Sequence, residues 1–171
     1  MSGGIQIRRA GREDIIQMAI FLNNCWKSAY RHMISPDYLD TMSVIGRFRG
    51  LSKRFDDGVS VFTMMFDGEE LIGAAIYGKS FTEEYEKDGE ISAIYLHENY
   101  IGKGYGNRLF VHAEQDLSGM GFACFVLEVL TDNTRAIRFY LSHGYEQVAD
   151  RSIRLGQTDY PLYVMRKKRT E

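Results

Sequence analysis

The sequence predicts one α/β domain over residues 1–171, built on a mixed, mostly antiparallel sheet of about six to seven strands with helices on both faces. Stretches with the two-residue period of strands alternate with stretches at helical spacing. One segment, Cys124 to Leu130, is almost wholly apolar, as a central buried strand should be. A chain of 171 residues is long enough for one hydrophobic core and short for two.

The N-terminal third combines one strand with helices. Ile5 to Arg9 alternates apolar and polar residues, which predicts a short strand. Between Arg12 and Tyr30 the apolar residues recur at helical spacing. Ser35-Pro36-Asp37 places a capping residue before a proline in the first turn of a helix. A second helical region, in one piece or two, is therefore expected up to Phe55.

A β-hairpin is expected in the middle of the chain. Val59 to Phe66 is rich in β-branched and aromatic residues, Asp67-Gly68 predicts a tight turn, and Glu70 to Tyr77 is the antiparallel partner. The acidic and polar stretch from Phe81 to Asp88 is expected to be a loop, and Glu90 to Leu96 a strand.

The remainder of the chain alternates helices and strands. Gly104 to Ser118 predicts a helix that begins directly at glycines, and Asn133 to His143 a helix that ends before Gly144. The remaining strands are expected at Cys124–Leu130, Tyr145–Ile153 and Tyr160–Met165. The resulting order, β-α-α-β-β-β-α-β-α-β-β, is that of a mixed sheet covered on both faces.

The composition excludes several classes of protein. The formal net charge is −2, whereas a protein that binds nucleic acid usually carries a basic excess. No apolar run is long enough to span a bilayer, and the first residues lack the pattern of a signal peptide. We therefore expect a cytoplasmic protein without a nucleic-acid or membrane partner. The four histidines lack the spacing of metal ligands, so no metal is expected.

A glycine-rich segment, Gly102-Lys103-Gly104-Tyr105-Gly106, lies between a predicted strand and a predicted helix. Glycine allows close approach to a ligand, and the N–H groups at a helix start attract an anion, so the segment suits a phosphate or pyrophosphate. It matches neither the nucleoside-triphosphate loop nor the dinucleotide fingerprint. Taken alone, it is equally compatible with a tight turn without a ligand.

A second pattern follows the apolar strand and reads Asn-x-x-Ala-x-x-Phe-Tyr and then Gly-Tyr. It occupies Asn133, Ala136, Phe139, Tyr140, Gly144 and Tyr145. Together with the glycine segment, it resembles the GNAT superfamily of acyl-CoA N-acyltransferases. The loop pattern of that family, Gln/Arg-x-x-Gly-x-Gly/Ala, is matched at Gly104 and Gly106, while Ile101 stands in place of Gln or Arg. Because the family contacts pyrophosphate there largely through backbone N–H groups, the departure removes only one side chain.

The resemblance implies an N-acetyltransferase that uses acetyl-CoA as cosubstrate, with no metal. In this family the fourth and fifth strands splay apart, and the pantetheine arm of the coenzyme enters the gap. The N–H of Leu96 is expected to face the acetyl carbonyl, Lys103 and Arg108 to add positive charge, and Asn133 to contact the arm. The cofactor-binding residues implied are Ile94, Tyr95, Leu96, Ile101, Gly102, Lys103, Gly104, Tyr105, Gly106, Asn107, Asn133 and Tyr140.

The resemblance also suggests residues for catalysis. Glu90 is the candidate base, directly or through a water, with an exposed strand-end carboxylate as the alternative. Tyr140 is the candidate acid for the departing thiolate, with a core tyrosine as the alternative. Glu128 lies inside an apolar strand, where a carboxylate needs a partner or a wet cleft. It is the second candidate for the base and a candidate contact of the acceptor, with a structural, hydrogen-bonded glutamate as the alternative.

The acceptor is expected to be a primary amine, on a small molecule or on a protein. Trp26 and Tyr30 lie one helical turn apart and are expected to line its pocket, although core packing would also explain them. The acidic loop, with Glu83, Glu84, Glu86 and Asp88, would attract a cationic amine or form a solvated face. Homodimers are common in the family, and the sequence does not compel one.

Two other functions stay open at this point. One is a catalytically inactive module that binds acyl-CoA and regulates another protein. The other is a protein that binds a nucleotide unrelated to coenzyme A.

Overall fold

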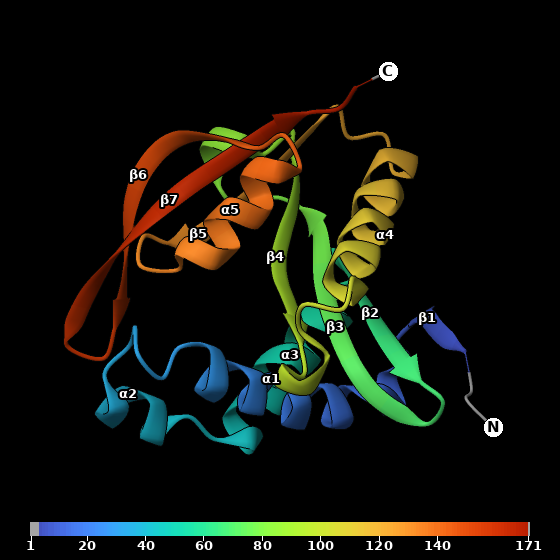
Figure 1. Cartoon of the computed structure of the whole chain (residues 1–171), viewed down its shortest axis with the longest axis vertical. Coiled ribbons are helices and arrows are strands. Elements are labelled where there is room, and N and C mark those ends of the chain that lie inside the picture. Colours follow the sequence, from blue (N-terminus) through green and yellow to red (C-terminus); the bar gives the residue numbers. More distant parts are fainter. Residues whose placement is uncertain (1–3, 171) are drawn as a thin grey trace.

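The computed structural model describes residues 4–170, which form a seven-stranded sheet in the order β1-β2-β3-β4-β5-β7-β6 (Figure 1). The strands are β1 (Ile5–Arg9), β2 (Ser60–Asp67), β3 (Glu70–Lys79), β4 (Gly89–Leu96), β5 (Cys124–Leu130), β6 (Glu146–Leu155) and β7 (Thr158–Lys168). The α-helices are α1 (Ile15–Ala29), α2 (Pro36–Thr41), α3 (Val44–Asp56), α4 (Tyr105–Gly119) and α5 (Thr134–Ser142). Neighbouring strands are antiparallel except for the parallel pair β4 and β5, so the predicted fold class is confirmed.

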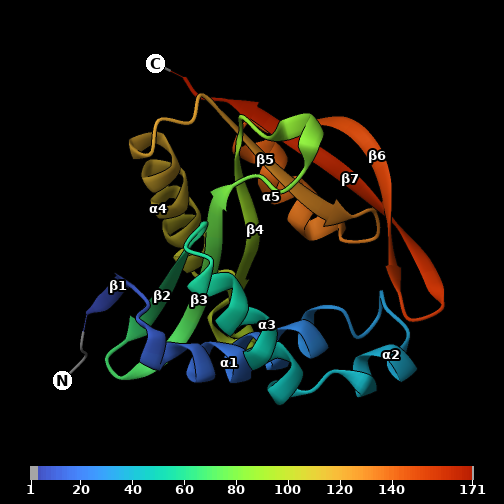
Figure 2. The ribbon, with the colours of Figure 1, turned by 180° about the vertical axis from the view of Figure 1, so that it is seen from behind.

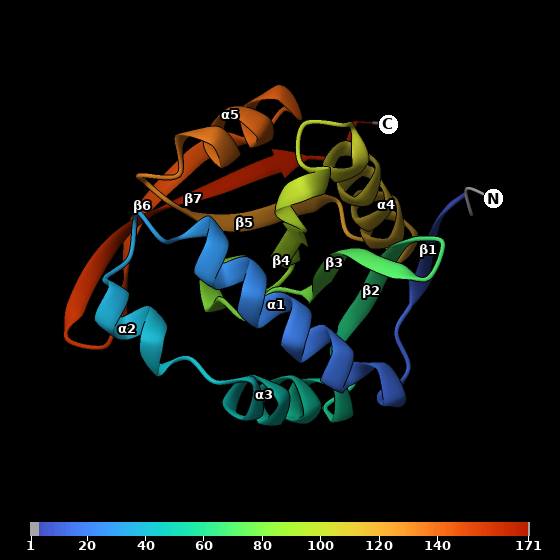
Figure 3. The same cartoon turned by 60° about the horizontal axis from the view of Figure 1, so that its bottom comes forward.

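The helices cover both faces of the sheet, as the sequence predicts. Figure 3 shows α1, α2 and α3 on one side and α4 and α5 on the other. One buried apolar cluster joins α1 to β2 and β3, and includes Ile15, Met18 and Leu22. The cluster on the opposite face centres on Leu109 and Phe110 of α4 and extends to β5 and α5.

A third apolar cluster ties the far end of the sheet to the segment between α1 and α2. Ile34 and Leu39 pack there against Leu130, Leu155 and Leu162. Figure 2 shows the hairpin of β6 and β7 reaching down toward α2. The backbone N–H of residue 35 also donates a hydrogen bond to the hydroxyl of Tyr160 across this contact, at 2.9 Å.

Local signals explain where the elements begin and end. The expected helix from Arg12 starts as a short 3₁₀ turn, and α1 begins only at Ile15. The second helical region is two helices, because Met42 adopts an extended backbone with ψ 121°. Ser43 then caps α3 by accepting a hydrogen bond from the N–H of Gly46, at 3.0 Å. The last two strands are longer than predicted, since only residues 156 and 157 separate them.

The parallel pairing of β4 with β5 is short. Within residues 4–170 it is confined to Gly89 opposite Phe125 and Glu90 opposite Val126, and the two strands diverge beyond these positions. Ser92 is an extra residue in β4 relative to β3, which makes a β-bulge just after the divergence begins. The expected splay between the fourth and fifth strands is therefore confirmed. None of the helices in the described part of the chain is long and apolar enough to cross a membrane.

The Phe110 ring is the packing centre of the face covered by α4 and α5. It is fully buried, and its centroid lies 4.7 to 5.7 Å from the rings of Phe139, Tyr140, His143 and Tyr145. We expect Phe110→Ala to lower the free energy of unfolding by about 3–5 kcal/mol, because it leaves a cavity among aromatic rings. Urea unfolding followed by circular dichroism measures the change.

Leu141→Ala is the matched control, since this side chain is 51% exposed and lies on α5, the helix whose opposite side packs against the Phe110 ring. It should change the free energy of unfolding by less than about 0.5 kcal/mol. Equal losses in the two variants would contradict the assignment of the core to the Phe110 face.

Candidate active site

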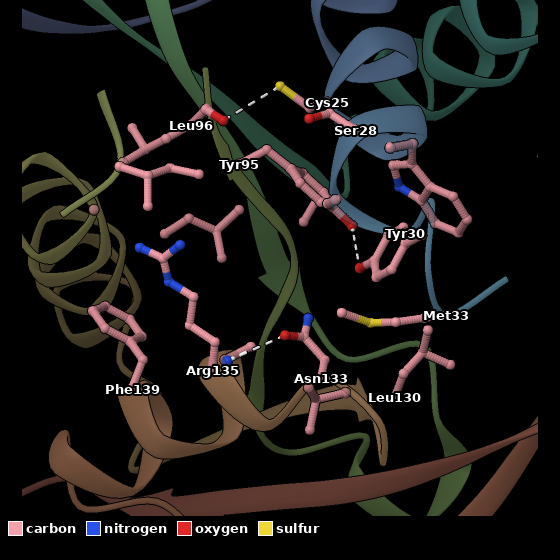
Figure 4. Close-up of a pocket in the computed structure, with 18 of the residues that line it drawn as sticks. Cys25, Ser28, Tyr30, Met33, Tyr95, Leu96, Leu130, Asn133, Arg135 and Phe139 are labelled. Atoms are coloured by element: carbon pink, nitrogen blue, oxygen red, sulfur yellow. Dashed lines mark hydrogen bonds between the residues drawn. The ribbon is translucent and has the colours of Figure 1, made fainter. Parts of the chain in front are cut away.

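A cavity of about 790 Å³ lies where β4 and β5 diverge, bordered by α1, the glycine segment, the start of α5 and the hairpin of β6 and β7 (Figure 4). Many of the predicted cofactor residues line it: Ile94, Tyr95, Leu96, Ile101, Gly102, Gly104, Gly106, Asn107, Asn133 and Tyr140. In the described chain, Lys103 and Tyr105 lie outside this lining. The Lys103 ammonium instead lies 5.4 Å from the centroid of the Tyr100 ring.

The start of α4 is shaped for an anion. Gly104 is its N-cap residue, with φ +87°, a left-handed conformation that favours glycine. No side chain caps this helix end, and its first turn holds no acidic residue. The first intrahelical bond runs from Arg108 N–H to the Gly104 carbonyl, so the preceding N–H groups, including those of Gly106 and Asn107, are available to a ligand. The Arg108 guanidinium donates a hydrogen bond to the Ile5 carbonyl of β1 at 3.1 Å, and its contribution of positive charge to the loop stays a prediction.

The backbone of β4 offers hydrogen-bonding groups to the gap in the sheet. His97 N–H donates to the Ile72 carbonyl of β3 at 2.8 Å. Along β4, the backbone N–H and carbonyl of successive residues point alternately toward β3 and away from it, so this bond fixes the direction for each residue. Tyr95 therefore directs its N–H and carbonyl toward β3, whereas Ile94 and Leu96 direct theirs to the opposite side, where β5 has moved away. The Leu96 N–H therefore faces the gap, and its role toward an acyl carbonyl stays a prediction.

The start of α5 contributes two polar side chains to the cavity. Asn133 caps the helix by accepting a hydrogen bond from Ala136 N–H at 3.2 Å, so its amide nitrogen is the end that can donate to a ligand. Figure 4 shows the Arg135 side chain extending from the same turn into the cavity. Arg135 was not among the predicted site residues, although its position inside the Asn-x-x-Ala motif could have indicated it.

Three tyrosines from three elements converge in the middle of the cavity. The hydroxyls of Tyr30, at the end of α1, and Tyr95, on β4, lie 2.9 Å apart. Burial raises the pKa of Tyr95 well above its ordinary value, and it also raises the pKa values of Tyr30 and Tyr140. Tyr140 lies close enough to affect both of the other hydroxyls electrostatically. All three phenols are therefore protonated, neutral groups at neutral pH.

Glu90 is placed at the edge of this arrangement. It sits at the last paired position of β4 and β5, and within the described chain it is not among the residues that line the cavity. One carboxylate oxygen accepts hydrogen bonds from the Ser80 hydroxyl at 2.8 Å and from the Phe81 N–H at 3.1 Å. Burial lowers the pKa of Arg54 on α3, and the Glu90 charge opposes that shift, so Glu90 lies on the α3 side of the sheet.

Glu128 lines the cavity directly, unlike Glu90. Its side chain is 41% exposed, and Arg151 Nη1 lies 3.5 Å from one carboxylate oxygen. The same guanidinium makes a shorter ion pair with Glu84, at 2.8 Å. Asp88 of the acidic loop is buried and paired with Arg166 at 2.6 Å. The loop is thus partly neutralised, which weakens it as an attractor of cationic amines.

The residues expected on the acceptor side also reach the cavity. Trp26 and Tyr30 line it and contact each other edge to face, with ring centroids 4.7 Å apart. Cys25, Met33 and Leu130 also line the cavity and were not among the predicted site residues. The Cys25 thiol lies 3.6 Å from the Leu96 carbonyl oxygen. These side chains come from separate elements, so no local motif marks them.

Known proteins share both the sequence pattern and the fold. The Acetyltransferase (GNAT) family matches residues 22–145, which is more than half of the chain and includes both motifs. The uncharacterized N-acetyltransferase YuaI of Bacillus subtilis (strain 168) is 28% identical over 152 residues, which cover 85% of this chain and 83% of the relative.

Two solved structures show the same fold. The PaiA N-acetyltransferase of Thermoplasma acidophilum, in complex with coenzyme A, superposes with a TM-score of 0.78 at 21% identity, covering 98% of this chain and 100% of its own. The ribosomal-protein-alanine N-acetyltransferase of Brucella melitensis gives a TM-score of 0.74 at 18% identity, covering 95% and 99%. The predicted N-acetyltransferase is confirmed, and the chain belongs to the Acetyltransferase (GNAT) family.

Proposed function

We propose that this N-acetyltransferase transfers the acetyl group of acetyl-CoA directly to a primary amine bound in the same cavity. The observation that carries the proposal is the meeting of two backbone devices at one place. The uncapped start of α4 presents N–H groups to a diphosphate, and the divergence of β4 from β5 presents strand groups to an extended arm. The PaiA structure, which has the same fold, contains coenzyme A.

The residues present fit this cosubstrate along its length. The N–H groups from Gly102 to Asn107 suit the diphosphate, and Arg135 supplies a positive charge on the facing helix. Ile94 and Leu96 suit the peptide-like arm, which would pair with β4 as another strand would. The amide of Asn133 is placed to donate to a carbonyl of the arm from the other side of the gap.

The neutral amine attacks the thioester carbonyl carbon, a C–N bond forms, and the C–S bond breaks. The N–H of Leu96 stabilises the charge that develops on the carbonyl oxygen. The sulfur leaves as a thiolate and takes the proton of the Tyr140 hydroxyl. An ammonium substrate loses two protons in total, of which one replaces the tyrosine proton and the other passes to solvent.

Two carboxylates are candidates for accepting the amine proton. Glu128 lines the cavity, whereas Glu90 lies beyond the lining and would require a bridging water. The partners of the two carboxylates differ as well. Glu90 accepts hydrogen bonds from the Ser80 hydroxyl and the Phe81 N–H, whereas Glu128 has the Arg151 guanidinium 3.5 Å away. We assign Glu90 the role of base through a water and Glu128 the role of contacting the acceptor. The acceptor is a small-molecule amine or a protein amino group.

The role of the α4 start is tested by Gly104→Ala. Alanine at φ +87° costs about 1–2 kcal/mol, so the loop should relax and turn its N–H groups away from the diphosphate. We expect the Kd for coenzyme A to rise about 5- to 30-fold in isothermal titration calorimetry. Gly119→Ala, at the other end of α4 and with open space around its Cα, should leave the Kd unchanged. Unchanged affinity in Gly104→Ala would count against the anion site.

The role of Tyr140 is tested by removing its hydroxyl. Because burial raises the pKa of this phenol, it keeps its proton below its ordinary pKa of about 10 and can act as an acid throughout pH 6–9. Tyr140→Phe should lower kcat about 100-fold over this whole range, with the Kd for coenzyme A changed less than about threefold.

Tyr145→Phe serves as its control, since this ring lies 6.2 Å from Tyr140 in the same aromatic cluster and its hydroxyl has no hydrogen-bond partner among residues 4–170. Its kcat should match the wild type. If Tyr140→Phe turned over normally, the acid would be another group. A wild-type protein that binds acetyl-CoA and acetylates no amine would instead support the inactive regulatory module.

Glu90→Gln separates a base from a structural carboxylate. The amide keeps the size of the side chain and an oxygen that can accept from Ser80 and Phe81, so folding should be retained. We expect kcat/KM to fall at least about tenfold and the shape of its pH profile to change, because the variant has no carboxylate to accept the amine proton. Glu86→Gln, at an exposed position of the neighbouring loop, should leave the profile as it is. A profile identical to wild type in Glu90→Gln excludes Glu90 as the base.

A further inference from the structure

The cavity is chemically divided along its length. The end at α4 and α5 is built of glycines, backbone groups and polar side chains, as the cosubstrate requires. The opposite end is apolar and draws on α1, the segment after it, β5 and the hairpin of β6 and β7. Its wall is made by Trp26, Met33, Ile34, Leu130, Leu155 and Leu162. An apolar wall favours an acceptor with an apolar body, because that contact removes apolar surface from water.

This wall is tightly supported from behind. Ile34, Leu130, Leu155 and Leu162 belong to one buried cluster, in which the hairpin and α2 hold each other in place. Gly156 at the hairpin tip lies so close to α2 that a Cβ there would meet the Tyr38 ring at 3.3 Å. The wall is therefore a fixed boundary of the cavity at this end, which favours an acceptor with a compact body.

Charge at the acceptor end is sparse. Among the described lining residues only Glu98, Glu128 and Arg135 are acidic or strongly basic. Glu98 is already paired with Arg31 at 3.1 Å, and Arg135 belongs to the cosubstrate end. Glu128 is the one carboxylate beside the apolar wall, and its own partner Arg151 is held more closely by Glu84. Within residues 4–170, the lining of the acceptor end thus holds one carboxylate for an ammonium group and no cation. Outside the lining, the Arg151 guanidinium lies 3.5 Å from Glu128, and the Arg47 guanidinium lies 5.4 Å from the centroid of the Trp26 ring.

We propose that the acceptor is a primary monoamine on a compact apolar body, aromatic or alkyl, with its ammonium group against Glu128. The inference rests on the proposed function and narrows its acceptor. An α-amino acid would bring a carboxylate that no cation of the described acceptor-end lining meets, and a diamine would press its second ammonium group against Leu155 and its neighbours.

Two matched pairs of acceptors test the inference, with thiol release from acetyl-CoA as the readout. Phenylalanine differs from 2-phenylethylamine only by its carboxylate, and 1,5-diaminopentane differs from pentylamine only by a second amine. We expect kcat/KM at least about 30-fold higher for 2-phenylethylamine than for phenylalanine, and at least about tenfold higher for pentylamine than for the diamine. Equal or reversed preference in either pair overturns the inference.

Variants connect these preferences to the residues. Glu128→Gln should raise the KM for pentylamine at least about tenfold and leave the Kd for coenzyme A unchanged. The control is Glu83→Gln, at an exposed position of the acidic loop outside the described lining, which should change neither value. Met33→Glu should shift preference toward 1,5-diaminopentane by adding a second carboxylate to the wall.

The outcomes distinguish the two proposals. Release with the amino acid or the diamine alone, at normal coenzyme A affinity, overturns this inference and keeps the proposed function. No release with any amine overturns both. An unchanged KM in a folded Glu128→Gln variant removes Glu128 from the acceptor site and with it the inference.

Discussion

The loss of pairing between β4 and β5 after Glu90 is the constraint on which the rest of the site depends. Backbone groups inside a sheet are normally consumed by the neighbouring strand, and leaving them without a partner is costly. Here the divergence leaves the groups of Ile94 and Leu96 facing a cavity. A ligand with amide groups of its own can form hydrogen bonds with them. The gap therefore favours an extended, peptide-like arm over a ligand without such groups.

The bulge at Ser92 determines which side chains surround that gap. By simple alternation, Glu90 and Tyr95 would face opposite sides of the sheet, because they are five positions apart. The extra residue reverses the alternation, so Tyr95 packs with the α1 cluster and its hydroxyl meets that of Tyr30. Tyr140 approaches from the opposite face through α5. The gap lets groups from both faces meet, and the three tyrosines converge there.

The parts of this protein that the sequence predicts are those encoded by local backbone chemistry. The Asp67-Gly68 turn, the glycine start of α4 and the Asn133 cap each depend on a few adjacent residues, and each is found where it was expected. The splay followed from the family resemblance, not from periodicity. The positions of Glu90 and Glu128 relative to the cavity could not be counted from the sequence, because they depend on where pairing with β5 ends. Arg135 and Met33 were not predicted, because they line the cavity only once α5 and the segment after α1 have packed beside the sheet.

The two ends of the cavity differ in the groups that would contact a ligand: mainly backbone groups at one end and side chains at the other. Similarity to other proteins is therefore more informative about the cosubstrate than about the acceptor. The proposed cosubstrate end relies on backbone groups and on glycines that permit them, so most other side chains could change without altering it. Chains that share only 18–21% of their residues with this one can therefore keep the same fold. The acceptor end relies on side chains such as Trp26, Leu155 and Glu128, which no backbone requirement fixes. Acceptor choice must consequently be argued from the residues of each chain, and here those residues form an apolar wall beside a single carboxylate.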